Sequence, residues 1–114
     1  MNDCLFCKIL KGTIPSQKVY EDEDTYAFMD INPQVKAHAL VICKVHTPDV
    51  AHHGELTDHQ LAACIRTCAK VARQMGLEET GYRIASNCGP HACQSVEHLH
   101  FHVMGGEQLS GRMG

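Results

Sequence analysis

The chain has 114 residues, of which 44% are hydrophobic and only 5% aromatic, and its formal net charge is −3. This length supports one domain with an aliphatic core that would gain from burying further surface in an oligomer. Its 10 lysines and arginines are scattered. We therefore exclude a nucleic-acid polymer as partner, because such binding requires a basic stripe.

The composition also favours a reducing compartment. No run approaches the roughly 20 apolar residues of a membrane span, and residues 1–4 lack the apolar stretch of a secretory signal. Seven cysteines, an odd number, do not suit a secreted disulfide scaffold. We expect a cytoplasmic protein that does not contact a membrane.

The N-terminal quarter predicts a short helix and a β-hairpin. Apolar residues at helical spacing over 4–10, closed by Lys11-Gly12, predict the helix. Two strands are predicted over 18–20 and 26–29, and the acidic run 21–24 between them predicts a solvated turn.

The middle of the chain predicts a buried strand, a loop and the main helix. The continuous apolar run 39–43 suits a strand covered on both faces, and the weakly patterned residues 49–56 suit a loop. Thr57 and Gln60 form a capping box, and Gly76 marks the end of the helix that follows. Its predicted buried stripe recurs at intervals of three or four residues: Leu61, Cys64, Ile65, Cys68, Ala72 and Met75.

The C-terminal third predicts two more strands, over 82–87 and 94–104, separated by a tight loop at 88–92. No internal repeat, low-complexity tract or linker interrupts the chain. The expected fold class is α+β, a mainly antiparallel sheet of about five strands with one long and one short helix. It forms a single domain over residues 1–114.

The last predicted strand alternates histidine with apolar residues, which places His98, His100 and His102 on one face. One interpretation is an accidental, solvated polar face. A second is a metal site that uses all three, but the outer two lie about 13 Å apart on a strand, too far for one ion. A third is a nucleophilic imidazole flanked by helpers.

These residues carry a resemblance to a known family. The segment Gln94-Ser95-x-x-His98-x-His100-x-His102-Val103-Met104-Gly105-Gly106 resembles the signature of the histidine-triad (HIT) superfamily, in the branch of Hint-type purine nucleoside phosphoramidases. Phe28-x-Asp30-Ile31-x-Pro33 and His38-x-Leu40-Val41-Ile42-x-Lys44-x-His46 also match, so the resemblance covers nearly the whole chain. It implies the HIT fold, with two subunits of a homodimer forming one continuous sheet, and an enzyme that acts on a purine nucleotide.

The resemblance implies a covalent mechanism. His100 would attack the α-phosphorus and become nucleotidylated, and water would then release the monophosphate. Charge on the phosphoryl oxygens would be met by His102, Ser95, Asn87 and the backbone amides of 93–95. The catalytic set implied in this way is His98, His100, His102, His38 and Ser95.

The resemblance also implies a nucleotide-binding set. Asp30 would accept hydrogen bonds from the ribose hydroxyls, and apolar side chains would hold the base. The full set is Leu5, Phe6, Ile9, Phe28, Asp30, Ile31, Asn87, Gln94, Ser95, His100 and His102. Taken singly, these residues have simpler explanations: Asp30, Asn87 and Ser95 as turn or strand-end residues, and the apolar ones as core.

A second cluster could bind a metal. Cys4-x-x-Cys7 is the local half of many zinc sites, although a redox pair or two buried thiols would explain it equally well. Some HIT proteins hold a structural zinc with such a pair and two histidines, here matched by His46 and His98. A zinc-bound His98 would not protonate the leaving group, which would then depend on the surroundings of His100 or on His38.

Three departures and two rival functions remain. Cys93 stands where the family usually has glycine and Cys43 where proline is common, and residues 109–114 lack the tryptophan of the Hint branch. Because this tryptophan is missing, the sequence does not predict which leaving group the protein prefers. The rival functions are hydrolysis of dinucleoside polyphosphates and a non-catalytic module that binds nucleotide or zinc.

Overall fold

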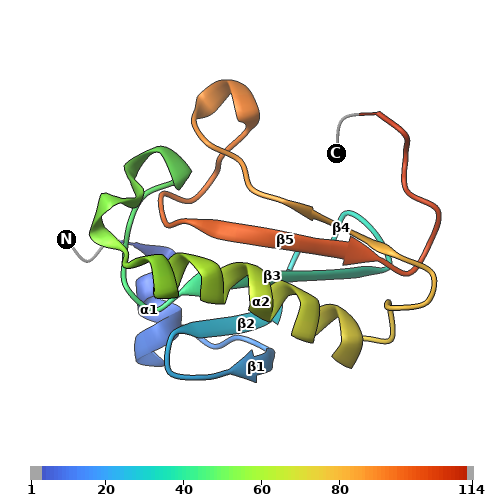
Figure 1. The fold of residues 1–114 in the computed structure, drawn as a ribbon, viewed down its shortest axis with the longest axis horizontal. Helices are drawn as coiled ribbons and strands as arrows, with labels where there is room; N and C mark the ends of the chain where they lie inside the picture. Colours follow the sequence, from blue (N-terminus) through green and yellow to red (C-terminus); the bar gives the residue numbers. More distant parts are fainter. Residues whose placement is uncertain (1–3, 113–114) are drawn as a thin grey trace.

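The computed structural model describes residues 4–112, apart from the side chain of His53. Its helices and strands are α1 (Leu5–Lys11), β1 (Lys18–Glu21), β2 (Thr25–Met29), β3 (Ala37–Cys43), α2 (Asp58–Gln74), β4 (Tyr82–Ala85) and β5 (His100–Gly105). All strand pairs are antiparallel, and the order across the sheet is β1-β2-β3-β5-β4 (Figure 1). The α+β prediction is confirmed. Within the described part of the chain, no helix is both long and apolar enough to span a membrane.

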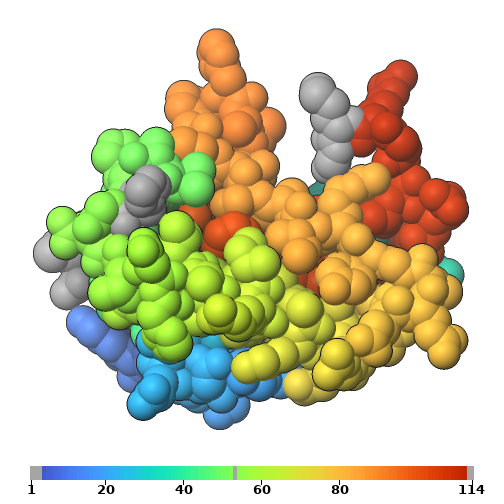
Figure 2. Space-filling model, viewed as in Figure 1, coloured from blue at the N-terminus to red at the C-terminus, as the bar shows by residue number. Residues whose placement is uncertain are grey.

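The central strand β3 separates two apolar layers. Alternate side chains point to opposite faces, so Ala39 and Val41 pack in the layer that α2 covers, with Leu99, Phe101 and Val103. Figure 1 shows α2 crossing this face of the sheet, and in Figure 2 its residues cover the middle of the molecule.

The opposite face of the sheet holds a smaller layer. Leu40, Ile42 and Phe28 pack there against Phe6 and Ile9 of α1. On β5 the two histidines lie on this side, because His100 pairs with Ile42 and His102 with Leu40. The predicted alternation is confirmed for His100 and His102, which share their face with α1, whereas His98 precedes the strand.

The predicted helix ends are confirmed. Gly12 follows α1 with φ 81°, and the Thr57–Gln60 capping box begins α2. After α2 the N–H of Leu77 donates to the carbonyl of Ala72 (2.9 Å), which is the long bond of a Schellman motif. It requires the left-handed backbone of Gly76 (φ 77°).

The structure differs from the predictions in several places, and strand β4 ends at Ala85 instead of residue 87. The side chain of Ile65 is exposed, and the buried stripe of α2 instead includes Ala63, Thr67 and Val71. Residues 50–55 form two short 3₁₀ turns that meet at a kink at His52, rather than a loop. Strand β5 begins at His100 instead of residue 94, because the pairing with β3 stops there.

The segment before β5 is held outside the sheet. Leu99 donates its N–H to the carbonyl of Thr47 (2.7 Å). The side-chain amide of Gln94 accepts from the N–H of Gly89 (2.8 Å) and donates to the carbonyl of Pro48 (2.8 Å). His98 therefore belongs to a bend that approaches α1, while His100 belongs to the strand.

Candidate active site and metal cluster

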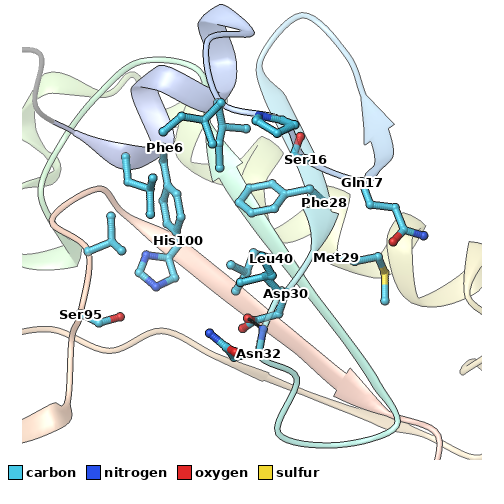
Figure 3. Close-up of a pocket in the computed structure, with 16 residues that line it drawn as sticks. Phe6, Ser16, Gln17, Phe28, Met29, Asp30, Asn32, Leu40, Ser95 and His100 are labelled. Carbon is cyan, nitrogen blue, oxygen red and sulfur yellow. Dashed lines mark hydrogen bonds between the residues drawn. The ribbon is translucent and has the colours of Figure 1, made fainter.

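A pocket of about 670 Å³ lies between α1 and the sheet, on the face opposite α2 (Figure 3). This volume suits a small-molecule ligand. Its walls are mostly apolar, and a few polar groups converge on it. The lining residues are Leu5, Phe6, Ile9, Ile14, Pro15, Ser16, Gln17, Phe28, Met29, Asp30, Ile31, Asn32, Leu40, Ser95, Val96 and His100.

His100 presents an unprotonated nitrogen in this pocket. Its Nδ1–H donates to the backbone carbonyl of His98 (2.7 Å), so the proton of the neutral ring is on Nδ1 and Nε2 keeps its lone pair. Burial lowers the pKa of His100, which favours the neutral ring. Phe6 packs edge-on against the imidazole at a centroid distance of 5.0 Å. The ring is held and protonated as a nucleophile or base must be.

The polar end of the pocket is built by two turns. Asp30 follows β2, and its Oδ1 accepts from the N–H of Asn32 (2.9 Å), so it caps a turn and lines the pocket at once. Ser95 follows Cys93, whose φ of 66° lies in the left-handed region that favours glycine. The amides of Cys93 and Gln94 donate back to Pro90 and Gly89 within the turn.

Five of the predicted catalytic or nucleotide-binding residues are not among the pocket-lining residues in the described part of the chain, and one of them, His98, belongs to the cluster of metal ligands described below. Asn87 and Gln94 are two of them, and Gln94 holds the turn, as described above. The other two, His38 and His102, are hydrogen-bonded to each other next to the pocket, with 2.9 Å between His38 Nε2 and His102 Nδ1. The ring centroids of His102 and His100 are 5.2 Å apart.

The predicted metal ligands meet in one cluster. One ligand atom from each of Cys4, Cys7, His46 and His98 lies within 4.8 Å of the others. His98 Nδ1 lies 3.3 Å from Cys4 Sγ and 3.2 Å from His46 Nδ1, and Cys7 Sγ lies 3.4 Å from His46 Nδ1. A tetrahedral zinc with ordinary bond lengths separates its nitrogen and sulfur ligands by about 3.3–3.8 Å. The geometry therefore fits such an ion.

The surroundings of the cluster leave its ligand atoms available. His98 donates Nε2–H to the carbonyl of Cys43 (2.9 Å), so Nδ1 carries a lone pair, and burial lowers the pKa of His98 to about 4. Burial and the neighbouring Cys4 thiol raise the pKa of Cys7 to about 11. Two adjacent thiolates would repel each other, and a divalent cation removes that penalty.

The sequence did not predict several of the groups that build the site. The segment 14–17 lines the pocket, and its only sequence marker is the proline that leads out of α1. The carbonyl of Cys43 and the N–H of Gln34, which donates to His38 Nδ1 (3.0 Å), orient imidazoles. Backbone groups of this kind leave no mark in an amino-acid sequence.

Comparisons with known proteins agree with this geometry. The HIT domain family model matches residues 11–109. The 14 kDa zinc-binding protein of Zea mays is 45% identical over 93% of this chain and 84% of the relative, and the purine nucleoside phosphoramidase of Escherichia coli (strain K12) is 38% identical over 94% and 90%. The solved structure of a HIT family hydrolase from Clostridium thermocellum superposes with a TM-score of 0.91 at 39% identity, covering 99% of this chain and 98% of that one.

Proposed function

The chain belongs to the HIT domain family, and from that membership we propose that it cleaves purine nucleoside 5′-phosphoramidates to the nucleoside monophosphate. The observation that carries the proposal is the neutral His100, whose unprotonated Nε2 is presented in a nucleotide-sized pocket. The phosphoramidase of Escherichia coli is similar along almost the whole chain, which supports the same substrate class.

The proposed reaction has two displacements at phosphorus. His100 Nε2 attacks the α-phosphorus, the P–N bond breaks, and the amine leaves with a proton taken from solvent, which the water of the second displacement returns. Water then attacks the nucleotidyl-histidine, releases the monophosphate and restores the neutral ring. The carbonyl of His98 stabilises the cationic intermediate, because it accepts a hydrogen bond from Nδ1–H throughout.

The polar and apolar lining groups suggest how the nucleotide binds. We place the ribose hydroxyls on Asp30, the acidic side chain among the lining residues, and the base between the apolar walls of Phe6, Ile9 and Phe28. The phosphoryl oxygens would be met by Ser95 and by His102 beside His100. His38 would act through His102, to which it is hydrogen-bonded. Asn87 and Gln94 would support the turn that carries Ser95.

We further propose that Cys4, Cys7, His46 and His98 hold a structural zinc. The ion would tie α1, which forms one wall of the pocket, to the bend that precedes β5. It would also hold His98, whose carbonyl orients His100. With zinc on Nδ1 and a carbonyl on Nε2, His98 has no proton to give to a leaving group.

For cellular location and oligomeric state, our proposal is the same as the prediction from the sequence. We propose a cytoplasmic homodimer, because the described cysteines are unpaired thiols and because the sheet ends in β1 and β4, each of which pairs with one strand only among the described residues. Light scattering coupled to size-exclusion chromatography tests the dimer, and a single-chain mass would overturn it.

The activity is tested by following AMP release from adenosine 5′-phosphoramidate and, in parallel, from diadenosine polyphosphate. Wild type, His100→Ala and the control His59→Ala, a histidine exposed on α2, are compared at equal concentration. We expect phosphoramidate turnover in wild type and the control, and its loss by about three orders of magnitude or more in His100→Ala. Preferential turnover of the dinucleotide would favour the polyphosphate hydrolase, and no turnover by folded wild type would favour a binding module.

A further inference from the structure

We propose that His38 is a positioning residue that makes His102 a donor through Nε2, by donating its own proton to His102 Nδ1. The inference deepens the proposed function, on which its catalytic consequence rests, but the hydrogen-bond chain itself can be tested without any substrate. The chain runs from the backbone of Gln34 through His38 to His102.

The first step in the chain is set by a backbone amide. The N–H of Gln34 lies 3.0 Å from His38 Nδ1, and an N–H can only donate. His38 Nδ1 must therefore be an acceptor. Burial lowers the pKa of His38, so the ring is neutral and its proton is on Nε2.

The second step is set by what surrounds His38 Nε2. His102 Nδ1 lies 2.9 Å away, within hydrogen-bond distance, and Asp30 Oδ2 lies 3.4 Å away as a close charged neighbour. The carboxylate of Asp30 also favours the proton on the nitrogen that faces it. His102 Nδ1 is then an acceptor, and the proton of the neutral His102 ring is on Nε2.

The rival occupant of this place is a metal ion. Asp30, His38 and His102 offer ligand atoms within 4.8 Å of one another, as the cysteine-containing cluster does. An ion there would need a lone pair on His38 Nε2. Because the Gln34 amide already uses the lone pair of Nδ1, the neutral ring has none left on Nε2. The same amide that fixes the proton therefore disfavours the ion.

The consequence concerns the phosphoryl group. An Nε2–H donor beside the nucleophile can stabilise the charge that develops on the phosphoryl oxygens, whereas the other tautomer would turn a lone pair toward it. A hydrogen bond accepted at Nδ1 also strengthens the donor at Nε2 through polarisation. His38 thus contributes to turnover from a buried place outside the pocket lining.

The test uses a matched pair of substitutions at one position. In His38→Gln the amide NH₂ can reach His102 Nδ1, and in His38→Asn the same amide is one methylene too short. The protein is purified without chelator, and ¹⁵N NMR of the imidazoles reports which nitrogen of His102 is protonated. AMP release from adenosine 5′-phosphoramidate gives kcat and KM for each variant.

We expect Nε2–H on His102 in wild type and in His38→Gln, and a mixture of tautomers in His38→Asn. We expect kcat to be about tenfold lower in His38→Asn than in His38→Gln, with similar KM. Protonated Nδ1 on His102 in wild type would overturn the proposal, as would a second equivalent of metal that His38→Asn removes. If wild type shows the expected tautomer but no turnover, the proposed function fails and the hydrogen-bond chain stands.

Discussion

Among the described residues, two clusters of potential metal ligands differ in the backbone group that holds one of their imidazoles. Both bring their ligand atoms within 4.8 Å. In the first, a carbonyl accepts the Nε2 proton of His98 and leaves Nδ1 for an ion. In the second, an amide donates to His38 Nδ1 and leaves a proton on Nε2. The comparison shows that the outer partner of an imidazole decides whether the ring offers a lone pair or a proton.

We expect the largest loss of folding stability from Cys7→Ser, which removes one ligand of the first cluster. The control is Cys88→Ser, which lies outside the cluster. A metal bound only by the folded state stabilises it by about 4 kcal/mol when its free concentration is a thousand times Kd. Such a loss would lower Tm by roughly 15 °C in a domain of this size. Metal content by elemental analysis and Tm by calorimetry check the prediction. Equal metal content and Tm in both variants would contradict the assignment.

We expect acid to lower the free energy of unfolding through a different process in each of the two clusters. Burial, followed by the nearby His100 and His38, lowers the pKa of His102 to about 4, and Asp30 opposes the shift. The unfolded chain then binds this proton first, so stability is complete above pH 6.5 and is lost as the pH falls toward 4. Because the ring is only partly buried, we discount its contribution to about 1–2 kcal/mol.

This prediction is checked by urea unfolding of wild type and His102→Asn at pH 7 and pH 4.5. We expect the free energy of unfolding to fall by about 1–2 kcal/mol more in wild type than in the variant. If the first cluster holds the proposed metal, acid has to displace that ion before His98 can be protonated, and metal release should then accompany the remaining loss. Parallel losses in the two proteins would show that His102 is protonated equally in both states.

We expect the smallest change in the free energy of unfolding from removing a histidine–carboxylate pair outside both clusters. His59 Nε2 lies 2.8 Å from Asp24 Oδ2, but the histidine side chain is 70% exposed. Water screens such a pair, so His59→Asn should change the free energy of unfolding by less than about 0.5 kcal/mol. Urea unfolding at pH 6 measures it. A decrease in the free energy of unfolding of more than about 1 kcal/mol would contradict the prediction, because it would show that this exposed pair stabilises the fold as much as a buried group does.

The sequence by itself determined the elements and the chemical inventory. Helix ends could be predicted because Gly12, Gly76 and the Thr57–Gln60 box act within one turn of the chain. The alternation of histidine with apolar residues could be predicted because a strand has a period of two. The HIT resemblance added the expectation that Cys4, Cys7, His46 and His98 converge, and the structure brings them together.

Only the tertiary structure decided where the protons and lone pairs of these histidines lie. His98 leaves the strand because β3 offers His100, and not His98, a partner. The tautomers of His98 and His38 depend on backbone groups of Cys43 and Gln34, and every residue type supplies those groups except for the missing N–H of proline. A side-chain pattern can therefore identify which imidazoles are present, but the fold selects which nitrogen of each one reacts, binds or donates.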